Sequence, residues 1–445
     1  MMWLGTVAQK WSFKAAIASI ALAHCAPVIA AQTFALKDGE TVVFYGDSIT
    51  AQRLYTKDVE EFVLTRYPQL HVRFVNAGVP GDTAAGGYAG TMAERVARDV
   101  APCLPGMITV MLGMNDGGWG YGSPDQIDAD FQSRYNALLQ TLRQAAPSAA
   151  LTLISATPYD EITHGTEFPG YSKMVDRLAG DVARIAAQAQ SQGEPPVLFA
   201  DFHRPVQDAL ERARAQDPEL AALLIPDRIH PAEAGHWIMA TALMRAWHVD
   251  PVVSSVELRA TDATVVASER TSVTGLRKSE TGLEWTQLDD ALPLPLDFNS
   301  AMTTLLLQIS DVNELDRQML RVEGLPPGTY SLLIDGKPVA AFAHGELERG
   351  INLALYKTPM LDQARDIAEN EDQRADLDHA AFILSANVKH TATTGDAEKA
   401  LRDAQDELNA EIRKQLSPGP HKFELRNTQT EAGKDAAGAR QGRPV

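Results

Sequence analysis

The chain has 445 residues, of which 45% are hydrophobic and 22% are charged, as is usual for globular proteins with a full hydrophobic core. Its length exceeds that of a typical single domain, so we expect two domains. The formal net charge of -18 disfavours nucleic acid and anionic membrane surfaces as partners, because both would repel the protein.

The first 31 residues have the pattern of a secretory signal peptide. Lys10 and Lys14 make a basic start, residues 15–23 are apolar, and small residues around Ala30 offer a cleavage site. A histidine and a proline cut the apolar run shorter than the roughly 20 residues that a membrane-spanning helix needs. We therefore expect an exported protein, periplasmic or extracellular, whose mature form has no membrane span.

Residues 32–250 repeat a strand–helix pattern. The apolar runs mostly lack polar alternation, which is typical of strands that helices cover on both faces. The alternation predicts an α/β fold with a parallel sheet, in which ligands bind beyond the carboxyl ends of the strands. The expected strands are 41–46, 71–78, 107–113, 151–157 and 196–202, and the expected helices are 58–67, 92–100, 131–146, 174–190 and 206–215.

Residues 251–425 have a different pattern, which predicts a β-rich accessory domain with helices. The expected short strands fall within 256–275 and 328–345, and two long, charged helices are expected over 358–384 and 396–416. Residues 426–445 contain too few apolar side chains to order themselves and are predicted to form a flexible tail. No catalytic signature occurs after residue 250, so the accessory domain is expected either to brace the catalytic domain or to act as a detachable binding module.

The first expected strand stops abruptly in Gly46-Asp47-Ser48, and Ser48 is therefore either an ordinary turn serine or a nucleophile. A nucleophilic serine needs a base that takes its proton, an acid that orients the base, and donors that face the developing oxyanion. In a parallel α/β sheet, all of these groups should lie on loops that follow strand ends.

Candidates for each part follow other strands. Gly81 follows the second strand, where its N–H can approach a substrate oxygen with no side chain intervening. Asn115 follows the third strand and can donate its side-chain amide. Asp227 and His230 lie three residues apart before the final helix, a spacing that lets the carboxylate reach Nδ1 and leaves Nε2 free to face a serine. The sequence leaves Asp201 open as an alternative partner of His230.

Together, "GDSIT", the glycine of "VPGDT", "LGMND" and "DRIH" resemble the motifs of the SGNH, or GDSL, hydrolase superfamily in their order and in their strand-end positions. The resemblance implies that Ser48 is the nucleophile, His230 the base and Asp227 its orienting acid. It also implies an oxyanion hole made by the backbone N–H groups of Ser48 and Gly81 and by the side chain of Asn115.

The resemblance covers about residues 38–250 and implies a flavodoxin-like fold, a three-layer α/β/α sandwich with a parallel sheet. Other chemistries fit less well. No serine stands in the Gly-x-Ser-x-Gly elbow of α/β-hydrolases, and the scattered histidines form no metal-binding pattern, so we expect neither a metal nor a cofactor. A second Asp-x-x-His pattern, Asp376 and His379, lies in an expected charged helix and is interpreted as surface.

The substrate is predicted to be an ester, with O-acetyl groups on carbohydrate favoured. Trp119 and Tyr121 lie on a glycine-rich loop beside the predicted oxyanion hole, and Tyr159 lies on a long loop after the fourth strand. Their rings either contact the substrate or fold back to close the loops. The alternatives are a lipid or thioester acyl hydrolase, of the lysophospholipase or arylesterase type, and a polymer-binding protein with secondary esterase activity. The sequence assigns no oligomeric state.

Overall fold

The computed structural model describes residues 33–428, except residues 166, 192, 194, 310–311 and 388–390. The predicted signal peptide, residues 1–31, and residues 429–445 of the predicted tail lie outside the described residues. The last described strand runs to Asn427, so the ordered chain continues two residues past the expected end of the accessory domain at 425.

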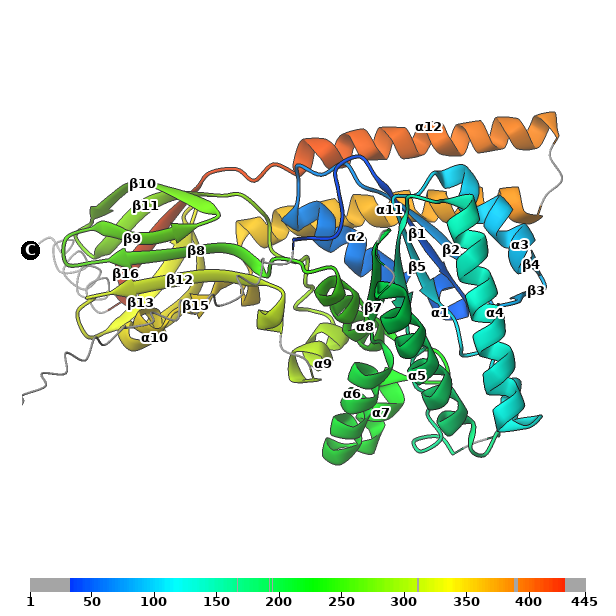
Figure 1. The fold of residues 1–445 in the computed structure, drawn as a ribbon. Helices are drawn as coiled ribbons and strands as arrows, with labels where there is room; N and C mark the ends of the chain where they lie inside the picture. The colour runs from blue at the N-terminus through cyan, green and yellow to red at the C-terminus, as the bar shows by residue number, and fades with distance from the viewer. Residues whose placement is uncertain are drawn as a thin grey trace, which may run out of the picture. The chain divides into compact units, whose positions relative to one another are not determined.

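The first part of the chain is built on a parallel sheet with the strand order β2-β1-β5-β6-β7 (Figure 1). Because the strands follow one another along the chain as β1, β2, β5, β6 and β7, this is the 2-1-3-4-5 order of flavodoxin-like folds. The predicted α/β/α fold is confirmed, and each expected apolar run contains one of its strands. These are β1 (Thr41–Gly46), β2 (Arg73–Gly78), β5 (Met107–Met111), β6 (Ala150–Ile154) and β7 (Val197–Ala200).

Helices cover both faces of this sheet because successive strand residues point to opposite sides. Val42 and Phe44 of β1 pack with α2, α6 and α8, whereas Val43 and Tyr45 pack with α4, α5 and the π-helical turn Val96–Val100. The long helices are α2 (Leu54–Arg66), α4 (Pro124–Ala145), α5 (Tyr171–Gln190), α6 (His203–Gln216) and α8 (Glu233–Ala246). The short elements are α1 (Ser48–Ala51), β3 (Gly86–Gly87), β4 (Gly90–Thr91), α3 (Met92–Arg95) and α7 (Pro218–Leu224).

The second part contains two further sheets around a core of their own, which includes Trp285 and Phe423 stacked at 5.1 Å. One sheet has the order β15-β12-β8-β9, and the other has the order β10-β11-β16-β13-β14. Their strands are β8 (Val252–Arg259), β9 (Thr264–Glu269), β10 (Thr271–Lys278), β11 (Gly282–Asp289), β12 (Arg317–Glu323), β13 (Thr329–Ile334), β14 (Lys337–Ala343), β15 (Ile351–Asn352) and β16 (His421–Asn427). The helices are α9 (Ala301–Ile309), α10 (His344–Arg349), α11 (Pro359–Asn387) and α12 (Ala392–Gln415), of which α11 and α12 are the two long helices predicted (Figure 1).

The two parts share a hydrophobic core. Leu294, Leu296 and Leu315 follow the predicted boundary at residue 250, yet they are buried in the core formed by α2, α6 and α8. Arg66 of α2 also forms an ion pair with Asp316 at 2.8 Å, and both side chains are fully buried. The type of secondary structure therefore changes at residue 250, but the hydrophobic core continues into residues beyond it.

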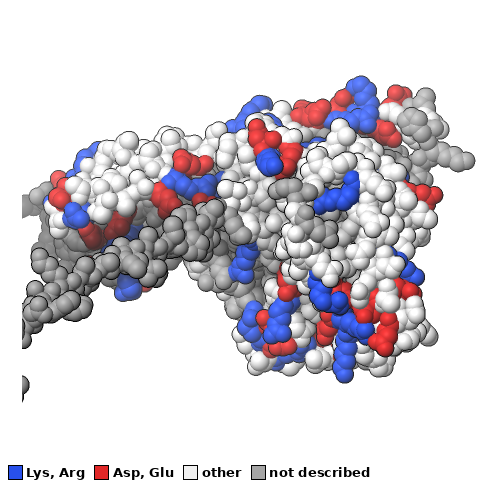
Figure 2. All heavy atoms as spheres, viewed as in Figure 1, with Lys and Arg blue, Asp and Glu red and all other residues white. Residues whose placement is uncertain are grey.

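The surface carries charges of both signs. On the face shown in Figure 2, most groups of acidic side chains lie next to basic side chains. Across the described part of the chain, no helix has both the length and the apolar composition needed to cross a bilayer.

Candidate active site

The turn that carries Ser48 packs directly onto two strand ends. Gly46 and Gly78 are paired neighbours at the carboxyl ends of β1 and β2. A Cβ atom on Gly46 would lie 2.2 Å from Thr50 Oγ1, and one on Gly78 would lie 2.3 Å from the amide nitrogen of Ala51. Because these distances are too short for any side chain, both positions require glycine, and α1 begins immediately at Ser48.

Ser48 lies within hydrogen-bond distance of the predicted base. Its Oγ atom is 2.8 Å from Nε2 of His230, although the two residues are 182 positions apart in the sequence. Nδ1 of His230 is 2.7 Å from Oδ2 of Asp227. The other carboxylate oxygen of Asp227 accepts bonds from the backbone amides of Ile229 (3.0 Å) and His230 (2.7 Å), which holds the loop in a tight turn. The structure thus brings Ser48, His230 and Asp227 into one continuous hydrogen-bonded chain.

These contacts keep Asp227 ionised. Partial burial alone would raise the pKa of Asp227, but hydrogen bonds from the amide and ring of His230 and from the amide of Ile229 outweigh burial and lower it. Asp201, the alternative partner in the sequence, lies elsewhere. Its carboxylate accepts bonds from Ser155 Oγ at 2.9 Å and from the amide of Arg204 at 3.1 Å.

Gly81 and Asn115 lie on neighbouring loops. Gly81 has a φ of 75°, the left-handed conformation that favours glycine, and no atom lies within 4 Å of the position that its Cβ would occupy. The side-chain amide of Asn115 donates to the backbone carbonyl of Asp82 at 3.0 Å. The two predicted oxyanion donors are therefore held on loops that are hydrogen-bonded to each other.

Three aspartates, none of which was predicted to have a role, lie next to the predicted nucleophile and oxyanion donors. Asp47 precedes Ser48, Asp82 follows Gly81 and Asp116 follows Asn115. Burial, together with the negative charge of neighbouring aspartates, raises the pKa of Asp47 and that of Asp116 to about 7. Their Oδ1 atoms accept the amides of Ile49 and Ala84 at 3.0 Å.

Asp82 is fully buried, and burial raises its pKa although Arg95 forms an ion pair with it. One oxygen of each of the three carboxyl groups is buried and has no hydrogen-bond partner within the described part of the chain. The sequence could have indicated these three aspartates, because each is adjacent to a residue of the predicted site.

The three predicted substrate-contacting aromatics differ in their environments. Tyr159 is only 3% exposed and packs edge-on against Tyr171, so its ring is part of the core and is not open to a substrate. Trp119 is half-buried and stacks on Tyr171 with ring centroids 4.6 Å apart. Tyr121 is 77% exposed and is the one of the three whose ring is open to a substrate.

A second histidine near the site, His236, belongs to the core. It is fully buried, its Nδ1 accepts the amide of Tyr55 at 3.2 Å, and its Nε2 lies 3.0 Å from Gln52 Oε1. Burial, with a smaller effect of the nearby His230, lowers the pKa of His236 to about 3, so His236 stays neutral. Among the described residues, no group of three or more histidines, cysteines and acidic residues is arranged to hold a metal ion.

The same region of the chain is recognised by comparison with known proteins. A model of the GDSL-like lipase/acylhydrolase family matches residues 44–238, which include every residue of the hydrogen-bonded chain described above. This region of the chain belongs to the SGNH hydrolase superfamily. As an SGNH hydrolase, the protein is a serine hydrolase of the type that acts on carboxylic ester bonds.

Two known proteins resemble the chain over different lengths. An acetylxylan esterase from Geobacillus stearothermophilus is 27% identical over 223 residues, which are 46% of this chain and 93% of that protein. The solved structure of a gut microbial diltiazem-metabolizing enzyme covers 89% of this SGNH hydrolase and 99% of its own chain, with 24% identity and a TM-score of 0.74. The second likeness shows that the fold extends through the C-terminal sheets as well as the catalytic region.

Proposed function

We propose that Ser48 is the nucleophile of an esterase whose base is His230 and whose orienting acid is Asp227. The observation that carries the proposal is the 2.8 Å distance between Ser48 Oγ and His230 Nε2, together with the 2.7 Å contact that continues to Asp227. This order of contacts fixes the tautomer in which Nδ1 carries the proton and Nε2 is free to accept one.

The reaction proceeds in two halves. Ser48 Oγ attacks the ester carbonyl carbon while His230 takes the hydroxyl proton, and the negative charge on the carbonyl oxygen is held by the N–H groups of Ser48 and Gly81 and by the amide of Asn115. The C–O bond to the alcohol then breaks, and the alcohol leaves with the proton from His230. Water attacks the acyl-enzyme with the same histidine as base, which releases the carboxylic acid and restores Ser48.

The proposed substrate is an O-acetyl group on carbohydrate. Two observations support it: the catalytic region resembles an acetylxylan esterase at 27% identity, and Tyr121 presents an exposed ring that can stack on a sugar. Lipid and thioester acyl hydrolysis is the alternative, and it requires a channel for a long acyl chain. The protein is further proposed to act after export, on the basis of the apolar N-terminal segment, and N-terminal sequencing of the secreted protein would detect cleavage near Ala30.

The test is hydrolysis of p-nitrophenyl esters from acetyl to palmitoyl, with Ser48→Ala as the blank. We expect turnover that is confined to short acyl chains and disappears in the variant, followed by release of acetate from acetylated xylo-oligosaccharides. A preference for long chains would replace the carbohydrate proposal with the lipid one. Equal rates in the wild type and in Ser48→Ala would refute the role of Ser48.

A further inference from the structure

Helix α11, the first of the two long helices, is joined by a hydrogen bond and an ion pair to the turn that carries Ser48. This turn ends at Arg53, whose amide donates to the carbonyl of Thr50 at 2.9 Å. Nη1 of Arg53 donates to the carbonyl of Ala375 at 3.0 Å, and its Nη2 forms an ion pair with Asp376 at 2.9 Å. A residue five positions after Ser48 is thus held by a helix that lies 322 residues further along the chain.

Arg53 has an unusual backbone conformation. Its φ of 65° and ψ of 0° are left-handed, and it immediately precedes α2. A residue with a side chain stays in this conformation only where its surroundings compensate for the strain. The contacts with Ala375 and Asp376 are such compensation, because they fix the guanidinium group of a side chain that is only 23% exposed.

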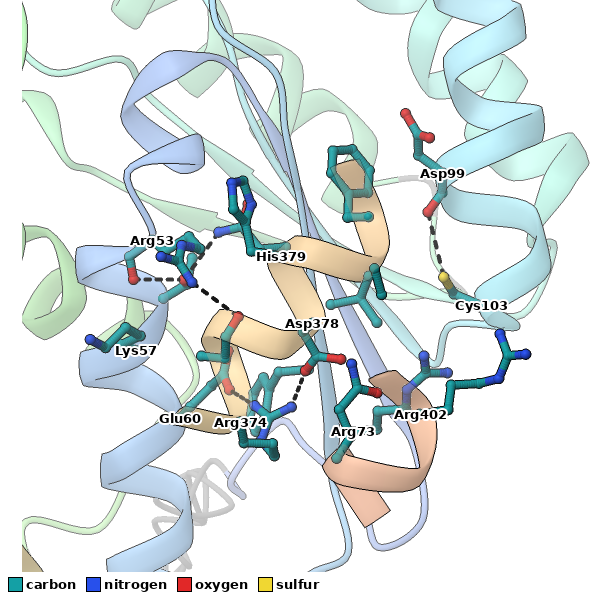
Figure 3. A pocket seen from close by; sticks show the side chains of 18 of the residues that line it. Arg53, Lys57, Glu60, Arg73, Asp99, Cys103, Arg374, Asp378, His379 and Arg402 are labelled. Carbon is teal, nitrogen blue, oxygen red and sulfur yellow. Dashed lines mark hydrogen bonds and ion pairs between the residues drawn. The ribbon is translucent and has the colours of Figure 1, made fainter. Parts of the chain in front are cut away.

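The contact continues along one face of α2. Lys57 forms an ion pair with Asp372, and Glu60 forms one with Arg374, in which both side chains are nearly buried. Because residues at positions i, i+4 and i+7 share one helix face, Arg53, Lys57 and Glu60 form a single seam against α11. Figure 3 shows this seam, with Arg374 between Glu60 and Asp378, beside a cavity of about 360 Å³ lined by α2, β2, α11 and α12.

We propose that α11 braces the nucleophile turn and that Arg53 is the positioning residue through which it acts. The proposal rests on the proposed function, in which Ser48 is the nucleophile. Attack on an ester carbonyl tolerates little displacement of Ser48 Oγ, so loosening the end of its turn lowers the rate of chemistry. Arg53 has no part in the proposed binding of substrate, and its loss therefore reduces kcat and leaves KM unchanged.

The kinetic test compares Arg53→Met with Arg53→Lys, and with Lys57→Met as the matched control on the same seam. We expect kcat on p-nitrophenyl acetate to fall about tenfold in Arg53→Met with KM unchanged, and to recover partly in Arg53→Lys, which keeps the charge facing Asp376. Lys57→Met should retain the wild-type kcat, because Lys57 lies inside α2, four residues past Arg53 and outside the turn that carries Ser48. A wild-type kcat in folded Arg53→Met, or equal losses in both methionine variants, would overturn the proposal.

Hydrogen exchange supplies a readout that needs no activity. Amides of residues 49–53 should exchange faster in Arg53→Met and in Asp376→Asn than in the wild type, and should be unchanged in Lys57→Met. Unchanged exchange in Arg53→Met would refute the brace whatever the protein hydrolyses. Faster exchange in a protein whose wild type is inert on every ester would support the brace and refute the proposed function, so the two failures are distinguishable.

Discussion

The side-chain amide of Asn115 donates a hydrogen bond to the backbone carbonyl of Asp82 at 3.0 Å and so joins the loops that follow β5 and β2. If Asn115 is an oxyanion donor, Asn115→Ala should lower kcat by about 100- to 1,000-fold with a smaller effect on KM. Steady-state kinetics on p-nitrophenyl acetate would measure this. Asn136→Ala, on the exposed surface of α4, is the control and should behave as the wild type. Retention of more than half of kcat in Asn115→Ala would exclude the proposed role.

The carboxylate of Asp227 should be indispensable, whereas that of Asp201 should not be. Asp227→Asn keeps the shape of the side chain but weakens its hold on the proton of His230 Nδ1, and we expect kcat to fall about 10,000-fold. Asp201→Asn is the isosteric control, since Asp201 bonds Ser155 and Arg204, and kcat should stay within about twofold of the wild type. The reverse ranking of the two variants would assign the orienting acid to Asp201.

Buried carboxyl groups should make stability depend on pH. Burial raises the pKa of Asp47 and of Asp116 to about 7, so the folded protein holds protons that the unfolded chain has already released between about pH 4 and pH 7. The contribution of these groups to the free energy of unfolding is therefore full at low pH and is lost as the pH rises to about 7. Asp116→Asn should reduce the fall in Tm across this window, as measured by thermal unfolding at a series of pH values. Asp406→Asn, at an exposed position of α12, is the control and should leave the dependence of Tm on pH unchanged. An equal dependence in the wild type, Asp116→Asn and Asp406→Asn would contradict the interpretation.

Tyr121 and Trp119 should affect different properties. Tyr121 is 77% exposed, so Tyr121→Ala should raise KM for acetylated xylo-oligosaccharides several-fold and leave both the Tm and the turnover of p-nitrophenyl acetate unchanged. Trp119 stacks on Tyr171, so Trp119→Ala should lower the free energy of unfolding by about 2 kcal/mol. An unchanged KM for oligosaccharides in Tyr121→Ala would remove this residue from the proposed sugar site.

The catalytic region should not fold well without the rest of the chain. A fragment that ends at residue 250 loses Leu294, Leu296 and Leu315, whose burial completes the core against α2, α6 and α8, and it leaves Arg66 without Asp316. An unpaired buried charge alone destabilises a protein by about 3–5 kcal/mol. We expect residues 32–250 to be insoluble or to lack a cooperative thermal transition by circular dichroism. A soluble and active fragment would instead favour the detachable module.

The parallel sheet could be predicted because its strands are buried on both faces and therefore appear as continuous apolar runs. Much of the candidate site could be predicted because Gly46, Ser48 and Asn115 occur in motifs at strand ends, where the topology gathers them, whereas His230 lies between α7 and α8 and was found by its spacing from Asp227. The identity of the aspartate that contacts His230 was harder to predict. The three-residue spacing favours Asp227 but leaves Asp201 open, and the turn after Asp227 distinguishes them.

Other features depend on packing, which local patterns do not encode. Tyr159 occurs in a long loop that suggests exposure, but edge-on contacts with Trp119 and Tyr171 bury its ring. The strand β16 was absent from the prediction, because its seven residues alternate too briefly and contain too many charges to stand out from a polar segment. The contact of Arg53 with Asp376 joins residues whose sequence neighbourhoods share no pattern.

The position of β16 has a consequence for how the chain emerges from the ribosome. Its residues, 421–427, form the middle strand of the β10-β11-β16-β13-β14 sheet, between hairpins that are synthesised much earlier. Until translation reaches residue 427, both hairpins present an open edge to the same gap, and open edges invite pairing with other chains. A truncation before residue 421 would therefore leave two open strand edges facing each other, so protection from aggregation waits for the synthesis of residues 421–427.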